Sequence, residues 1–288
     1  MKFSLYLHSF LPHELATIAT AAERSGFHGV VTGDHPVHPV AVEPRYPYGE
    51  GRYSESSVAA ETPSLDPLLC GSLVAGATQR LHYMTGVYLP LLRHPLITAK
   101  QVSVLSGFLG GRLTFGVGIG WMREEFDCLG EQWDARGARF DEVLEICRAV
   151  WAGGHVGHCG RFYDFPAVGT VPTPPVPVPL HFGGHSDAMM RRAATLGDGW
   201  ICSPKIDMLR TQVTSVRRLR EDAGTADRPF EFSAMCLDLA SLEVFAELGV
   251  EHAILLPPWR PVRPTHPPVP GEKEDLIAAL IDQARARC

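Results

Sequence analysis

The sequence lacks the features that mark several large classes of protein. It has no block of five or more like charges, and a net charge of −6 over 288 residues offers no basic surface to nucleic acid. No apolar stretch approaches the roughly 18 residues that a membrane helix needs. Polar residues and Pro12 between His8 and His13 interrupt the short apolar run at the N-terminus, which favours a first strand over a signal peptide. We therefore expect a cytoplasmic protein that acts on a small molecule, without nucleic acid or membrane partners.

Patterns for disulfides, metals and common nucleophiles are also missing. The seven cysteines are scattered, odd in number and never spaced C-x-x-C, so reduced thiols are expected. His38, His181 and His185 could contribute to a metal site, but no Asp or Glu is spaced to complete an obvious set with them. Neither a G-x-S-x-G elbow nor a P-loop occurs. We expect no metal, and a metal-dependent hydrolase remains the least favoured alternative.

Short runs of β-branched and aromatic residues alternate along the chain with longer amphipathic stretches. Hydrophobic residues make up 45% of the sequence, which suffices for a sizeable core. The pattern predicts strands over residues 2–7, 29–32, 81–85, 113–117, 180–182, 199–202, 230–235 and 252–256. It predicts helices over residues 14–25, 65–77, 95–105, 136–151, 186–196, 208–223, 241–248 and 273–287.

Eight consecutive β-α units indicate a parallel sheet and match the count of a (β/α)8 TIM barrel. We predict one such domain over residues 1–288, with insertions. An open doubly wound sheet is the alternative that periodicity leaves open. The segments that interrupt the alternation include a long polar loop over 33–63, placed on the catalytic face of a barrel, and a small hairpin over 155–165. Proline-rich connectors over 171–179 and 257–270 also interrupt it.

The string Phe115-Gly-Val-Gly-Ile-Gly-Trp121 ends the fourth predicted strand almost entirely in glycine. A Rossmann fingerprint would need a third glycine where Trp121 stands, so the spacing excludes it. Gly118 and Gly120 would let a flat ring or a backbone approach closely. The same glycines are equally typical of a tight corner between strand and loop.

The string Phe182-Gly183-Gly184-His185-Ser186 joins the fifth predicted strand to a helix. Exposed N–H groups at a helix start form an anion site, and barrels place phosphate sites at such positions. A plain glycine turn capped by Ser186 is the alternative.

Asp34 and His35 follow the second predicted strand directly. Histidine titrates near neutrality and can give or take a proton at a strand end. An ordinary turn before Pro36 is the competing interpretation.

Taken together, these strings resemble the luciferase-like family. The resemblance rests on Leu105–Gly107 with Gly111–Leu113, on Gly116–Trp121 with Glu124–Phe126, and on Arg139–Glu142. It continues through Gly160–Tyr163, Gly183–Ser186, Arg191–Ala194 and Gly197–Trp200, in order from Lys2 to about Trp200. Beyond that point the match is mainly topological.

The resemblance implies a (β/α)8 barrel that binds FMN or coenzyme F420, a deazaflavin, at the C-terminal ends of its strands. It implies that Gly183, Gly184 and Ser186, with His185 beside them, hold the phosphate. It implies that Thr85-Gly86-Val87 supports the ring from behind, with a cis peptide bond predicted between Gly86 and Val87. Gly118, Gly120 and Trp121 complete the expected cofactor site. Many members form dimers, so a homodimer is expected.

The pair Asp34-His35 resembles F420-dependent sugar-phosphate and alcohol dehydrogenases of this family, which favours the F420 branch. On that basis hydride passes between the deazaflavin and a small organic substrate, with His35 moving the proton and Asp34 tuning or positioning it. The loop from Pro36 to Pro63 matches no substrate-defining pattern. An FMN-dependent monooxygenase or reductase, and a barrel that binds cofactor without catalysis, are the alternatives.

Overall fold

Eight parallel strands form a closed barrel in the order β1-β10-β9-β8-β7-β4-β3-β2. The computed structural model describes residues 1–7, 10–40, 64–257 and 272–288, so most of the loop predicted over 33–63 lies outside the described residues. The barrel strands are β1 (Lys2–Tyr6), β2 (Gly29–Thr32), β3 (His82–Thr85), β4 (Leu113–Val117), β7 (Leu180–Gly183), β8 (Gly199–Cys202), β9 (Glu231–Cys236) and β10 (His252–Leu255). The predicted (β/α)8 barrel is confirmed, and the open sheet is excluded.

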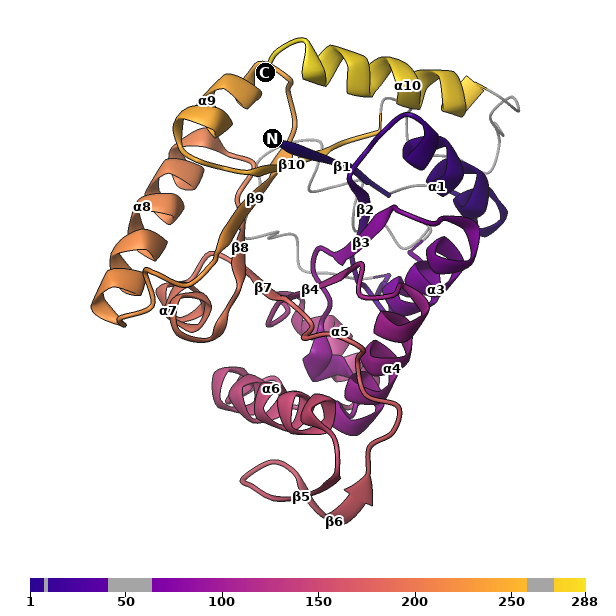
Figure 1. Ribbon diagram of the computed structural model, residues 1–288. Coiled ribbons are helices and arrows are strands. Elements are labelled where there is room, and N and C mark those ends of the chain that lie inside the picture. The colour runs from indigo at the N-terminus through magenta and orange to yellow at the C-terminus, as the bar shows by residue number, and fades with distance from the viewer. Residues whose placement is uncertain (8–9, 41–63, 258–271) are drawn as a thin grey trace.

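Helices surround the strands on the outside (Figure 1). They are α1 (Leu15–Arg24), α3 (Pro67–Ala77), α4 (Pro95–Phe108), α5 (Arg123–Leu129), α6 (Arg136–Ala152), α7 (Asp187–Leu196), α8 (Ile206–Asp222), α9 (Ser241–Glu247) and α10 (Glu272–Arg285), with short 3-10 turns η1 (Pro12–Glu14) and η2 (Pro90–Leu92). The predicted hairpin is confirmed as β5 (His155–Cys159) and β6 (Asp164–Gly169), which project beyond α6. The sequence reasoning missed α5.

Local signals explain where the helices begin and end. Asp66 caps α3 by accepting hydrogen bonds from the backbone N–H groups of Leu68 and Leu69, at 2.9 and 3.1 Å. Ser186 caps α7, as predicted, through the N–H of Met189 at 3.3 Å. Gly26, with φ of +84°, follows the end of α1 in a left-handed conformation that suits glycine.

Alternate residues of each strand face opposite sides of the barrel wall, as strand geometry requires. The outward set packs against the helices and forms the main hydrophobic core. The inward set has an apolar group toward the C-terminal ends of the strands, made of Tyr6, Val31, Met84 and Ile254. Two positions earlier, β1, β3 and β10 carry Ser4, His82 and His252 instead. The barrel interior is therefore apolar beneath its mouth and polar at its base.

Candidate active site at the barrel mouth

All the predicted site residues lie at the C-terminal ends of four strands, β2, β3, β4 and β7. These strands are consecutive neighbours in the barrel, so the four strand ends meet at one side of the mouth. In TIM barrels this face carries the active site. The sequence thus brings together segments that are up to about 150 residues apart along the chain, as parallel strands do whenever they pair.

The segment after β3 has the predicted backbone. The peptide bond between Gly86 and Val87 is cis, and both residues are half-buried. Thr85 is fully buried, and its hydroxyl donates to the carbonyl of Gly116 at 2.7 Å. Thr85 therefore joins β3 to β4, while Gly86 and Val87 are accessible to a ligand.

Two of the glycines make room for Val87, so the expected open slot is corrected in part. A Cβ added at Gly118 would come within 2.6 Å of one Val87 methyl, and a Cβ at Gly183 within 2.6 Å of the other. Such distances are closer than real contacts allow, and both glycines are buried. The half-buried side chain of Val87 therefore fills the space beside Gly118 and Gly183.

The segment after β4 is held by aromatic packing. Gly120 has φ of +80°, and a Cβ there would approach the ring of Phe126 to 2.8 Å. The carbonyl of Gly120 accepts from Nη1 of Arg136 at 2.8 Å, and the guanidinium lies 3.2 Å from the ring centroid of Trp133. Trp121 is half-buried and thus remains accessible at the mouth.

The segment after β7 leaves its backbone accessible where α7 begins. Gly184 and His185 are half-buried and Ser186 is exposed. Burial, with Lys205 nearby, lowers the pKa of His185 to about 4, so the ring is neutral near pH 7. An anion at this position would thus meet backbone N–H groups and the Ser186 hydroxyl rather than a histidine cation.

Asp34 is buried and pairs with residues of the loop after β3. Its side chain is 1% exposed. Its carboxylate accepts from Arg93 at 2.7 and 3.0 Å and from the N–H of Leu89 at 2.9 Å. Burial raises the pKa of Asp34, and the Arg93 guanidinium opposes that rise. The carboxylate therefore joins the end of β2 to the loop after β3.

His35 is the predicted residue that presents a titratable group to the mouth. Its side chain is 24% exposed, and its Nδ1 lies 3.1 Å from Oε1 of Glu125 in α5. The ring centroid lies 6.2 Å from that of Trp121, edge to face, and 5.2 Å from that of His38. The acidic partner of His35 is thus Glu125, 90 residues away along the chain, and not its neighbour Asp34.

Two residues that sequence reasoning missed are therefore Glu125 and Arg93. Glu125 was part of the family signature but carried no assigned role. The available signal was its place just after a glycine-rich strand end, where a barrel gathers its functional groups. Arg93 gave no signal, because its pairing with Asp34 spans 59 residues.

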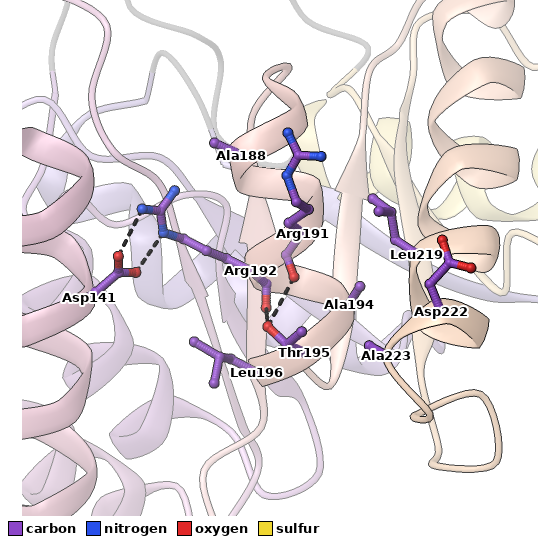
Figure 2. A pocket seen from close by; sticks show the side chains of 10 residues that line it. All are labelled: Asp141, Ala188, Arg191, Arg192, Ala194, Thr195, Leu196, Leu219, Asp222 and Ala223. Atoms are coloured by element: carbon purple, nitrogen blue, oxygen red, sulfur yellow. Dashed lines mark hydrogen bonds and ion pairs between the residues drawn. The ribbon is translucent and has the colours of Figure 1, made fainter.

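A shallow groove of about 550 Å³ lies away from this site, on the outside of the barrel between α7 and α8. Figure 2 shows Asp141 of α6 paired with Arg192 of α7, at 2.6 and 2.9 Å, with Leu219 and Asp222 of α8 on the other side. None of the predicted site residues lines this groove.

Among the described residues, no group of three or more His, Cys, Asp or Glu is placed to hold a metal ion. The described helices include none that is long and apolar enough to cross a bilayer.

Comparison with known proteins places this geometry in a family. The model for luciferase-like monooxygenases matches residues 3–238. An uncharacterised protein of Mycobacterium tuberculosis is 32% identical over 225 residues, which cover 77% of this chain and 76% of that protein. An F420-dependent glucose-6-phosphate dehydrogenase of Beutenbergia cavernae is 32% identical over 248 residues, covering 84% of this chain and 65% of the dehydrogenase.

Solved structures agree on the fold. An F420-dependent secondary alcohol dehydrogenase, in complex with an F420–acetone adduct, superposes over 99% of both chains with a TM-score of 0.75 and 18% identity. A coenzyme F420-dependent tetrahydromethanopterin reductase of Methanopyrus kandleri gives a TM-score of 0.72 at 16% identity, over 97% of this chain and 96% of the reductase. A monooxygenase of Streptomyces bottropensis gives 0.67 at 22% identity, over 100% and 83%. This chain belongs to the luciferase-like monooxygenase family.

Proposed function

We propose that the protein is an F420-dependent oxidoreductase in which His35 moves the proton that accompanies hydride transfer. The observation that carries the proposal is the placement of His35: a partly exposed imidazole, paired with a buried carboxylate, at the mouth of the barrel. A histidine so placed can act as acid or base near neutral pH. Relatives named for F420 dependence support the choice of cofactor.

The described residues fit a cofactor with a flat ring and a phosphate. Val87 offers an apolar, half-buried surface against which a ring can lie, and Trp121 is accessible on the neighbouring strand end. Gly184, His185 and Ser186 offer accessible backbone and a hydroxyl at the start of a ten-residue helix, where an anion is favoured. When bound, F420 supplies a carbon that accepts or donates a hydride. The protein contributes orientation and proton transfer.

The buried members of the predicted cofactor site act through the backbone in this proposal. Gly118 and Gly183 leave space for Val87, Gly120 leaves space for Phe126, and Thr85 joins two strands. Asp34 positions the end of β2, and thereby its neighbour His35, through Arg93. Its proposed role is therefore indirect.

A side-by-side titration of the purified protein with F420 and with FMN tests the choice of cofactor. We expect F420 to bind at least about tenfold more tightly, which corresponds to ~1.4 kcal/mol. Preference for FMN would support a flavin-dependent monooxygenase or reductase on the same scaffold, an alternative that the similar monooxygenase fold keeps open. Failure to bind either cofactor would overturn the proposal.

The substrate is proposed only as a small organic molecule that gives or takes a hydride. Related proteins are named for glucose 6-phosphate and for secondary alcohols, so these are the first compounds to assay for F420 reduction. F420 binding without turnover across such a panel would favour a barrel that binds cofactor without catalysis.

The homodimer expected from the family is also a proposal. Helix α3 contains no charged residue and exposes Leu69 and Leu73, while the adjacent α4 contains one lysine and exposes Ile97 and Phe108. A pair of helices with a single charged residue and exposed apolar side chains suits contact with a second copy about a twofold axis. Sedimentation equilibrium should give the mass of two chains, and the mass of one chain would contradict it.

A further inference from the structure

Glu125 is an unusual carboxylate for the interior of a protein. Glu125 is 0% exposed. Its Oε1 pairs with His35, whereas its Oε2 makes no hydrogen bond to any described residue. Glu142 provides the contrast, because it accepts from the backbone of Phe162 and Tyr163 and also contacts His158. A buried carboxylate with a single partner is costly, so its retention calls for an explanation beyond packing.

The position of Glu125 is fixed by its neighbours along the chain. Phe126 is fully buried, and its ring packs edge to face on Trp133 with centroids 5.2 Å apart. Arg136 lies over Trp133 and holds the carbonyl of Gly120. The packing of Phe126, Trp133 and Arg136 fixes the position of α5, and in that position the Glu125 side chain contacts His35.

The pairing distinguishes the two nitrogens of His35. A carboxylate can only accept hydrogen bonds, so a hydrogen bond at 3.1 Å requires Nδ1 to carry the hydrogen. Nε2 makes no hydrogen bond to any described residue. In the neutral ring Nε2 then has its lone pair free to accept a proton, and in the cationic ring it has a proton to give.

We propose that Glu125 is a positioning residue that fixes the tautomer of His35, making Nε2 the atom that exchanges a proton with the substrate. This inference rests on the proposed function. In oxidation of an alcohol, the C–H electron pair would leave as hydride to F420. The O–H bond would break with it, its electron pair completing the C=O bond and its proton forming a bond to Nε2. The carboxylate of Glu125 faces the imidazolium so formed and balances its charge. In the reverse direction the carbonyl carbon would take hydride from reduced F420, and its oxygen would take the proton from Nε2.

The ¹⁵N NMR spectrum of the histidine rings tests this without any substrate, since the chemical shifts report which nitrogen carries the hydrogen. Spectra are recorded in alkaline buffer, and the His35 signals are identified by their loss in His35→Gln. In the wild type we expect the hydrogen on Nδ1. In Glu125→Leu, which removes the acceptor, we expect the hydrogen mainly on Nε2, the form that free imidazole side chains prefer.

Controls separate this effect from a change of fold. Asp127→Asn alters an exposed carboxylate on the same helix, 60% exposed in its side chain, and should leave the His35 signals unchanged. If Glu125→Leu does not fold, Glu125→Gln serves, because an amide can donate to Nδ1 as well as accept from it, and the Nε2-protonated fraction should rise. His35 with its hydrogen on Nδ1 in every folded Glu125 variant would overturn the inference.

The same variants distinguish a failure here from a failure of the proposed function. Wild-type protein that binds no F420 would remove the F420-dependent function, while the tautomer result still decides the role of Glu125. Where turnover is measurable, Glu125→Leu should slow it roughly ten- to a hundredfold, less than the about 10²–10⁴-fold expected from a proton-transfer group. It should cause no further loss in a His35→Ala background, because it acts through that ring. Additive losses would contradict the inference.

Discussion

Two histidine–glutamate pairs lie at opposite ends of this barrel with the same distance between Nδ1 and the carboxylate oxygen. At the mouth, His35 Nδ1 is 3.1 Å from Glu125, and at the base, His252 Nδ1 is 3.1 Å from Glu231. In the pair at the base of the barrel, both residues have a second partner. His252 Nε2 contacts the Ser4 hydroxyl at 2.7 Å, and Glu231 also pairs with Lys2. The mouth pair leaves one nitrogen and one oxygen without described partners. The distance within a pair therefore says little about function, which depends on what its remaining atoms meet.

Electrostatics at the base support a structural role. Burial would raise the pKa of Glu231, but the hydrogen bond from His252, with Lys2 alongside, holds it well below its usual range. His28 stacks on His82 at 5.1 Å between centroids, and His82 contacts the Thr114 hydroxyl at 2.9 Å. The base is thus closed by a hydrogen-bonded polar network, whereas the mouth keeps accessible groups.

The largest expected effect is on activity at the mouth. Replacing His35 by Ala should slow F420-dependent turnover by about 10²–10⁴-fold, the usual contribution of a proton-transfer group. F420 affinity should stay nearly unchanged, because the ring and phosphate contacts are elsewhere. Steady-state rates and a binding titration measure the two quantities. The matched change at the base, His252→Ala, should lower the free energy of unfolding. An unchanged turnover rate in His35→Ala would show that the pair at the mouth has no catalytic role either.

The pair of Asp34 and Arg93 should matter next, through stability. Asp34→Ala leaves a half-buried guanidinium without its bidentate partner, and breaking a buried pair in this way costs about 3–5 kcal/mol. Chemical denaturation measures the loss in free energy of unfolding. Asp127→Asn, at an exposed pair, should cost far less. If Asp34→Ala kept the stability of the wild type but lost turnover, Asp34 would take a direct part in catalysis.

The histidines at the base should make the fold sensitive to acid. Burial lowers the pKa of His82 to about 3 and that of His181 to about 4, from an ordinary 6.5. Protons therefore bind more tightly to the unfolded chain, and the free energy of unfolding falls as pH drops through 6.5 toward 4. Between pH 7 and pH 6 we expect a loss of about 1–2 kcal/mol from these two groups. Denaturation at both pH values measures it.

Two variants sharpen that measurement. His181→Leu removes a buried ring whose Nδ1 has no hydrogen-bond partner, and should reduce the loss between the two pH values. His155→Gln, on the exposed hairpin, should leave it unchanged. A loss of equal size in all three proteins would show that the acid sensitivity arises outside the base of the barrel.

The smallest expected effect concerns Ser186, which caps α7. Ser186→Ala should lower the free energy of unfolding by about 1 kcal/mol through loss of the cap. In the proposed function it should also weaken F420 binding, because the same hydroxyl faces the phosphate. Ser241 provides the control, because it is the first residue of α9 and follows the N-cap Ala240, so Ser241→Ala should change neither quantity. Unchanged F420 affinity in Ser186→Ala would argue against a phosphate at this helix.

Much of the fold could be predicted because its signals are local. Strand β2 matched its predicted bounds of 29–32, and glycines and capping residues fixed several helix ends. Helix α5 was missed because seven residues after a glycine-rich loop are too short to show a helical period. Inward-facing histidines such as His82 and His252 occupy alternate strand positions, but one sequence does not reveal which face of a strand points to the barrel axis.

Candidate site residues could be predicted only where they lie directly after a strand. His35 and the Ser186 cap were located from neighbouring residues, and the cis bond before Val87 from the family resemblance. The partners Glu125 and Arg93 were not, because pairs that span 90 and 59 residues leave no local spacing to detect. Val87 also fills space that the glycine pattern alone suggested was open.

A crystal structure of the protein grown with F420 tests the central claim most directly. The account predicts the phosphate at Gly184–Ser186, the ring against Val87, and the imidazole of His35 facing the side of the ring left open to substrate. F420 bound anywhere else, or bound with its ring turned away from His35, would contradict it.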